Sequence, residues 1–203
     1  VIGIAALGSS IVQIKERDDW IGWQWSQFAG AMAERPTIRM ARWMNDRLDS
    51  ALGELFLDDL IEDGLYWPSL WADPTEDAIE RLRKESAARR DDHRRFVLRR
   101  EFKGGIEPDD TEAWRQRAES DLFRSKRCLA LADLLRCRAA LLPFFSPPTR
   151  NGLAMALADA EGRRAIGDLV RRAKAETVGT VMADLTVCGA IAPYNALLGG
   201  KLV

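Results

Sequence analysis

The residues best able to do chemistry lie near the end of the sequence, where we expect a strand, a tight turn and a helix. Residues 185–188 are apolar and rich in strand formers, Gly189 can turn the chain, and Pro193 suits the first turn of a helix. Free N–H groups at such a helix start can bind a phosphate, although an ordinary strand-to-helix turn is the alternative. The candidate residues for an unidentified phosphate-bearing cofactor are Gly189, Pro193, Tyr194, Asn195, Gly199, Gly200 and Lys201.

Other familiar kinds of site match the sequence poorly. Gly200-Lys201 is followed by Leu rather than Ser or Thr, so the phosphate-binding loop of nucleotide hydrolases is not supported. The single histidine, His93, lies in a charged predicted helix and is expected to face solvent, so a His-ligated zinc site and a Ser-His-Asp triad are both poorly supported. Asp58 and Asp59 are adjacent, so we expect them to point to different sides of a helix as solvated charges. We therefore predict no metal site and name no catalytic residue.

Strand-like sequence lies at both ends of the chain, and helical spacing dominates between them. We expect residues 1–7 and 185–188 to share one sheet, with a turn at residues 8–10 and a resumed strand at residues 11–14. The chain begins in an apolar run without Met and stops within an apolar helix, so we expect a fragment of a longer protein.

The middle of the chain contains two long predicted helices, at residues 75–102 and 109–142. Gly104-Gly105 between them should turn the chain and make them an antiparallel helical hairpin. The prediction is therefore an α+β fold. Its incomplete core comprises residues 1–25 and 179–203, and residues 26–178 are a mainly helical insertion.

Charge is unevenly distributed within this insertion. Residues 44–80 hold eleven acids and one base, a net charge of −10, whereas residues 81–103 hold ten bases and four acids, a net charge of +6. The two segments can lie against each other or be solvated, or the basic helix can face nucleic acid or an acidic partner. The candidate residues for such a surface are Arg89, Arg90, Arg94 and Arg95.

Three tryptophans fall within residues 20–25, directly after a charged segment. They favour either a hydrophobic plug at the edge of a sheet or a platform for stacking a ligand. The motif residues in and before this cluster are Arg17, Asp18, Trp20, Gly22 and Trp23.

Three short motifs together resemble the Druantia protein A family, first catalogued as a domain of unknown function and later linked to anti-phage defence. They are Ile-Gly-Ile-Ala-Ala-Leu-Gly-Ser at residues 2–9, Arg-Asp-Asp-Trp-Ile-Gly-Trp at residues 17–23, and Cys-Gly-Ala-Ile-Ala-Pro-Tyr-Asn at residues 188–195 with Leu-Gly-Gly-Lys-Leu-Val at residues 198–203. The helical middle departs from compact members of the family. The resemblance implies a prokaryotic defence component whose partners are other defence proteins, and it supplies no catalytic residue.

The order of elements in that family is similar to acetyltransferase-like folds, in which a turn and helix hold the pyrophosphate of an acyl-CoA. The acetyltransferase loop pattern, Gln/Arg-x-x-Gly-x-Gly/Ala, is absent here. An acyltransferase-like enzyme using the turn and helix at residues 189–201 is nevertheless the first alternative function. The second is a nucleic-acid or protein interaction module that works through the basic helix at residues 81–103.

Composition narrows the setting of the protein. Only three cysteines occur, with no Cys-x-x-Cys pair, which favours a reducing, cytoplasmic location. No apolar run reaches membrane-spanning length, so we expect no membrane association. The net charge of −1 gives no general affinity for nucleic acid.

Overall fold

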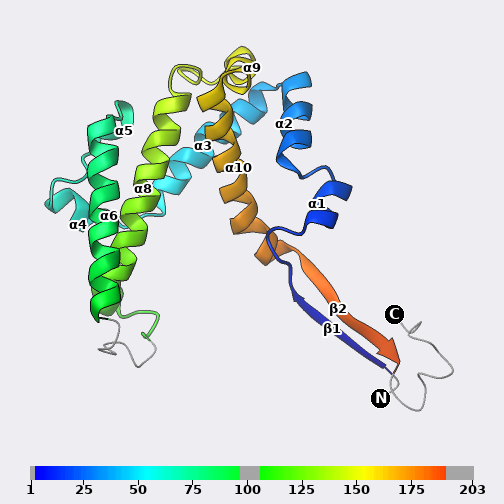
Figure 1. Cartoon of the computed structure of the whole chain (residues 1–203), viewed down its shortest axis with the longest axis horizontal. Coiled ribbons are helices and arrows are strands. Elements are labelled where there is room, and N and C mark those ends of the chain that lie inside the picture. The colour runs from blue at the N-terminus through cyan, green and yellow to red at the C-terminus, as the bar shows by residue number, and fades with distance from the viewer. Residues whose placement is uncertain (1–2, 97–105, 191–203) are drawn as a thin grey trace. The chain divides into compact units, whose positions relative to one another are not determined.

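The computed structural model describes residues 3–96 and 106–190, which form helices and one small sheet (Figure 1). The chain divides into two compact units. Unit 1 comprises Val1–Glu34 and Val170–Val203, and unit 2 comprises Arg35–Leu169. The sequence predicts that the core and the insertion join at residues 25/26 and 178/179. In the structure each boundary between the two units lies nine residues further into the predicted insertion. The described fold is α+β, mostly helical with a two-stranded antiparallel sheet.

The sheet joins the two ends of the chain, as predicted. Strand β1 (Gly3–Ser9) pairs with β2 (Ala183–Ala190) in antiparallel register, with an irregularity after Ala6. Two details of the prediction are wrong. No turn interrupts β1 at residues 8–10, since both Gly8 and Ser9 stay in the ladder, and residues 11–14 form no second strand.

The turn predicted at the end of the second strand is also wrong. Gly189 was expected to turn the chain, but it pairs with Ile4 within the ladder, and β2 runs on to Ala190. An extended glycine satisfies its backbone hydrogen bonds in the sheet, so its freedom to turn is not used here.

The described part of unit 1 also contains three helical segments. Helix α1 (Lys15–Trp20) and α2 (Trp25–Glu34) follow β1, and the last part of α10 (Ala160–Val181) leads into β2. The turn between α1 and α2 places Gly22 at a φ of 75°, a backbone conformation that glycine adopts far more readily than other residues.

Unit 2 holds the remaining helices. In chain order they are α3 (Ile38–Gly53), α4 (Asp58–Glu62), α5 (Ser69–Ala72), α6 (Glu76–Phe96), α7 (Thr111–Glu119), α8 (Asp121–Leu141), α9 (Arg150–Ala158) and the first part of α10. The expected helical hairpin is present as α6 and α8, which lie side by side (Figure 1). They are antiparallel, since Arg89 contacts Asp121 while Arg83 contacts Asp133. The predicted Gly104-Gly105 connection lies outside the described residues.

The predicted single helix over residues 109–142 is two helices, because the backbone breaks at Ser120. Its ψ of 149° is extended, and its hydroxyl donates to the carbonyl of Arg117 at 2.7 Å. A serine side chain that bonds a nearby carbonyl competes with helix continuation, which explains the break.

The core of unit 2 forms where α6 meets α8. Ile79 and Leu82 of α6 are buried with Leu131 and Leu135 of α8, and Leu60 of α4 joins the same cluster. Spacings of three and four residues place these side chains on one side of each helix, so burying them stabilises the hairpin. Unit 2 thus has a hydrophobic core of its own.

Candidate functional site

A polar cluster in unit 1 brings the motif at residues 17–23 together with segments far away in the sequence. Its centre is Asp18 of α1, which is buried, with only 5% of the residue exposed. One carboxylate oxygen of Asp18 accepts hydrogen bonds from the Arg17 guanidinium at 3.0 and 3.1 Å, and the other accepts from Lys174 Nζ at 2.6 Å. Lys174 belongs to α10, so the cluster ties α1 to α10, the last helix that the structure describes.

The Arg17 guanidinium also fixes the segment that leaves β1. It donates to the hydroxyl of Ser10 at 2.7 Å and to the carbonyls of Ile11 and Val12 at 2.8 and 2.9 Å. The Ser10 hydroxyl in turn donates to Asp184 of β2 at 3.1 Å. Arg17 therefore links the segment after β1 to α1 and, through Ser10, to β2. The planar guanidinium can do this because it offers several hydrogen-bond donors at once.

Trp23 completes the cluster. Its backbone N–H donates to the carbonyl of Asp18 at 2.7 Å. The Arg17 guanidinium and the Lys174 ammonium lie 5.7 and 5.4 Å from the centre of its ring, within the range of cation–π attraction. Trp20, by contrast, is 90% exposed, so the predicted hydrophobic plug is wrong for that residue.

The charge state of Asp18 follows from these contacts. Burial by itself would raise its pKa, but the hydrogen bonds from Lys174 and Arg17 outweigh burial and hold the pKa of Asp18 below its ordinary value. An ionised carboxylate bound by two cations is a poor general acid. In the part of the chain that the structure describes, no buried side-chain polar atom lacks a hydrogen-bond partner. The arrangement is therefore suited to holding four segments in place.

The residues predicted to bind a phosphate-bearing cofactor are placed only in part. Gly189 lies in β2, while Pro193, Tyr194, Asn195, Gly199, Gly200 and Lys201 lie outside the described residues. The cofactor site remains a prediction. Among the described residues no group of His, Cys, Asp and Glu side chains is arranged to hold a metal ion.

A second polar network, in unit 2, was missed at the sequence level. Asp59 of α4 is buried and accepts two hydrogen bonds from Arg127 of α8 and one, at 3.1 Å, from Arg124. Arg124 also donates to Glu85 of α6 at 2.9 Å. The prediction that Asp59 is a solvated charge is therefore wrong, although its neighbour Asp58 is exposed as expected. The i, i+3 spacing of the two arginines was the available signal, but it does not identify their partner.

Burial also lowers the reactivity of Cys128, a thiol of α8 near this network. Removal from water raises the pKa of Cys128 to about 11, so this buried thiol stays protonated and is a poor nucleophile at neutral pH.

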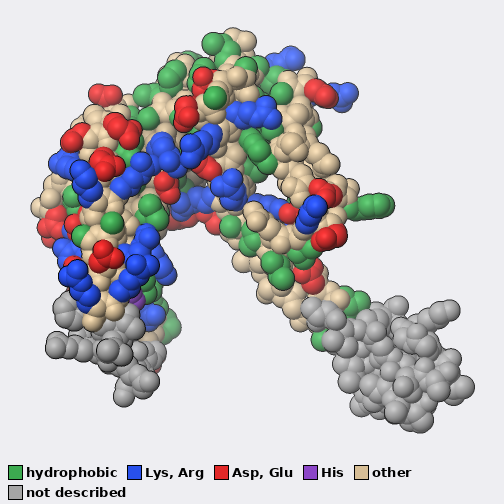
Figure 2. All heavy atoms as spheres, viewed as in Figure 1, with side chains coloured by type: hydrophobic (Ala, Val, Ile, Leu, Met, Phe, Trp, Pro, Cys, Tyr) green, Lys and Arg blue, Asp and Glu red, His purple; other side chains and the backbone are tan. Residues whose placement is uncertain are grey.

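The basic helix is only partly engaged with acids. Arg89 contacts Glu85 and Asp121, whereas Arg90, Arg94 and Arg95 are exposed. Figure 2 shows Lys and Arg side chains over α6 and α8, with acidic side chains between them.

The acids of the preceding segment are divided between two sets of partners. Asp77 and Glu80 pair with Arg81 and Lys84 within α6, whereas Asp58 contacts Arg115 of α7. Asp59 and Asp63 both contact α8. The expected contact between the acidic and basic segments is therefore seen locally on α6, while other acids contact α7 and α8.

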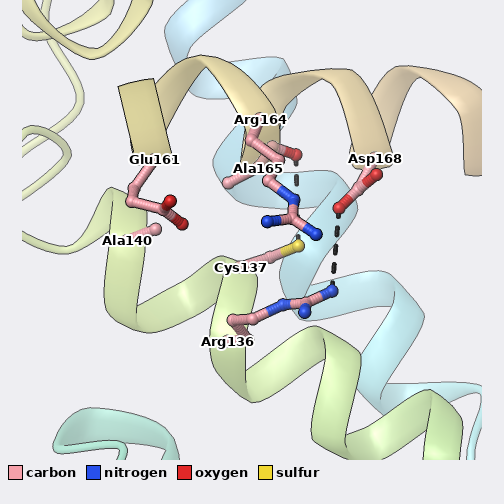
Figure 3. A pocket seen from close by; sticks show the side chains of 7 residues that line it. All are labelled: Arg136, Cys137, Ala140, Glu161, Arg164, Ala165 and Asp168. Carbon is pink, nitrogen blue, oxygen red and sulfur yellow. Dashed lines mark hydrogen bonds and ion pairs between the residues drawn. The ribbon is translucent and has the colours of Figure 1, made fainter. Parts of the chain in front are cut away.

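A shallow hollow lies between α8 and the first part of α10 (Figure 3). Arg136 contacts Asp168 across it at 3.9 Å, and the thiol of Cys137 lies 4.0 Å from the carbonyl of Ala165. The lining residues are Arg136, Cys137, Ala140, Glu161, Arg164, Ala165 and Asp168. Two arginines face two acids, so the hollow has no net preference for a charged ligand.

Comparison of the chain with protein-family models, curated proteins and solved structures finds no match. In the described residues no helix is both long and apolar enough to cross a membrane.

Proposed function

We propose that the chain belongs to an anti-phage defence component of the Druantia protein A type. The observation that supports this proposal is the assembly of unit 1. Residues 3–9 of the first motif pair with residues 183–190, which include the start of the third motif, and residues 17–23 belong to the same unit. Most of the chain separates the first two motifs from the third. A family defined by short distant motifs is expected to bring them together in one framework.

The contacts of Arg17 and Asp18 give the second motif a physical role in this proposal. Asp18 holds Lys174 of α10, and Arg17 holds the segment between β1 and α1. A change at either residue would disturb the framework that carries the other motifs. In this reading unit 1 is the family core and unit 2 is an insertion, which agrees with the separate hydrophobic core of unit 2.

The acyltransferase alternative lacks support from the described geometry. Gly189 is extended within β2, and the rest of the candidate cofactor site lies outside the described residues. The acetyltransferase-like relationship and the cytoplasmic location accordingly remain predictions.

The test is the efficiency of phage plating on bacteria that carry the complete gene in its native gene cluster. Deleting the gene should restore plating, and Asp18→Asn should restore it too, because a neutral amide weakens the hold on Lys174 and Arg17. Asp19→Asn is the matched control, since Asp19 is the exposed neighbour of Asp18. Protein abundance is measured in each strain.

Unchanged plating of a broad phage panel after deletion would contradict the proposal. If deletion restores plating but Asp18→Asn protects as well as the wild type, at equal abundance, the defence role stands and the role given to Asp18 is wrong.

A further inference from the structure

A row of basic side chains follows one side of α6 in unit 2. Arg83, Arg90 and Arg94 are spaced by seven and four residues, so they lie on the same side of the helix. Arg90 and Arg94 are exposed, and Arg83 is half-buried. At 1.5 Å of rise per residue the row from Arg83 to Arg94 is about 16 Å long.

Helix α8, which packs beside α6, adds further basic side chains next to these arginines. Asp133 contacts Arg83 at 4.0 Å and Arg136 at 3.2 Å, which places this side of α8 beside the arginines of α6. Lys126, seven residues before Asp133, lies on the same side of α8 and is exposed. We call Arg83, Arg90, Arg94, Lys126 and Arg136 the basic row.

The acids nearby leave this row with surplus positive charge. Asp133 is shared by two arginines, Arg94 contacts Asp91 at 3.7 Å, and Arg136 contacts Asp168 at 3.9 Å. Within the described ranges no ion pair is seen for Arg90. Among the described residues the five bases therefore pair with three acids, and Glu76, exposed and seven residues before Arg83, is a fourth acid on the same side of α6.

The acidic segment that could have covered the row is held elsewhere. Asp59 and Asp63 contact Arg124 of α8, and Asp58 contacts Arg115 of α7. These acids are thus engaged by arginines outside the basic row.

From this arrangement we infer that the basic row binds the sugar–phosphate backbone of nucleic acid without sequence preference. Four of its five members are arginines, whose planar donors pair well with phosphate oxygens. About 16 Å spans roughly five nucleotide steps at 3.4 Å each, so the α6 arginines can follow one strand. Two packed helices supply a firm support for such contacts. The inference is independent of the proposed defence role.

The test is fluorescence anisotropy of a labelled DNA duplex and of one of its single strands, titrated with the 203-residue chain at several salt concentrations. Arg90→Glu with Arg94→Glu should weaken binding by about tenfold or more at low salt. With three to four phosphates contacted, log Kd against log salt should have a slope of about 2.7 to 3.6 for the duplex and about 2.1 to 2.8 for the single strand. The matched control is Arg81→Glu with Lys84→Glu, which changes the same charge on other sides of the same helix and should bind within about twofold of the wild type.

Three results would overturn the inference. They are no binding of either DNA at low salt, an equal loss in both double variants, and displacement of DNA by polyglutamate at the same charge concentration, which would indicate an acidic protein partner. Circular dichroism checks that each variant is folded. If the Glu variant is not, Arg90→Gln with Arg94→Gln removes the same contacts with less disturbance and must also weaken binding, by less than charge reversal because it adds no negative charge.

Discussion

Asp59 and Arg127 form a buried pair in unit 2, with two parallel hydrogen bonds of 2.6 and 2.7 Å between carboxylate and guanidinium. Arg127 further donates to the carbonyls of Phe56 and Ala118, so the cation is satisfied from several sides. Short bidentate arginine–carboxylate pairs of this kind are among the strongest polar contacts in proteins. This pair fastens α4 to α8.

Removing one member of the pair should be costly. Asp59→Ala leaves Arg127 buried without its counter-charge, and such losses amount to about 3–5 kcal/mol. Asp58→Ala next to it removes only an exposed contact with Arg115 at 3.5 Å, so the expected cost is below about 1 kcal/mol. Urea unfolding of the two variants measures both effects. Equal midpoints would show that the buried pair contributes no more than its exposed neighbour.

Stability should fall on acidification because the carboxylates of this network take up protons at a lower pH in the folded protein than in the unfolded chain. Burial opposes ionisation of Asp59 and Glu85, but hydrogen bonds and the charges of Arg127, Arg124 and Arg89 outweigh it and hold both pKa values below the ordinary 3.8 and 4.5. The unfolded chain therefore takes up protons first as the pH drops. The contribution to stability is present above the ordinary values and is lost as the pH falls through the lowered ones.

The measurement is the free energy of unfolding in urea from pH 7 to pH 3. The wild type should lose stability from about pH 5 downward. Asp59→Asn should show a shallower decline, since one of the linked carboxylates is absent. A steeper decline in the variant would contradict the account.

Two helical glycines should respond oppositely to alanine. A Cβ at Gly162 would lie 2.6 Å from the carbonyl oxygen of Ala156, so Gly162→Ala should cost about 1–3 kcal/mol through overpacking. At Gly30 in α2 a Cβ meets nothing within 4 Å, so Gly30→Ala should stabilise the protein by about 0.5–1 kcal/mol. Thermal denaturation distinguishes the two. A higher melting temperature for Gly162→Ala would show that α9 and α10 can separate easily.

The sequence was sufficient for features that depend on local pattern. The strand-forming runs at the two ends predicted β1 and β2, and helical spacing predicted α6 and α8. The break at Ser120 could not be read from that spacing, because one serine hydroxyl decides it. Likewise, the charge of Asp59 does not reveal that residues 124 and 127 surround it, since only the folded chain brings those positions together.

The candidate site was predictable only as a motif. Arg17, Asp18 and Trp23 were identified from their resemblance to a family, but Ser10 and Lys174 carried no signal of their own. Lys174 lies 156 residues beyond Asp18 in the sequence, within a helix that holds many other charged residues. Only tertiary packing selects it as the partner.

The pairing of β1 with β2 has an entropic consequence for the chain between them. Ser10 and Asp184, which join at the base of the sheet, are 174 residues apart. Closing a flexible loop costs free energy that grows only with the logarithm of its length.

Removing the 135 residues of Arg35–Leu169 would leave a separation of 174 − 135 = 39 residues. The longer loop then costs only about 1.3 kcal/mol more, from (3/2)RT ln(174/39). A helical body with its own core can thus be accommodated between two paired strands at small expense to their association.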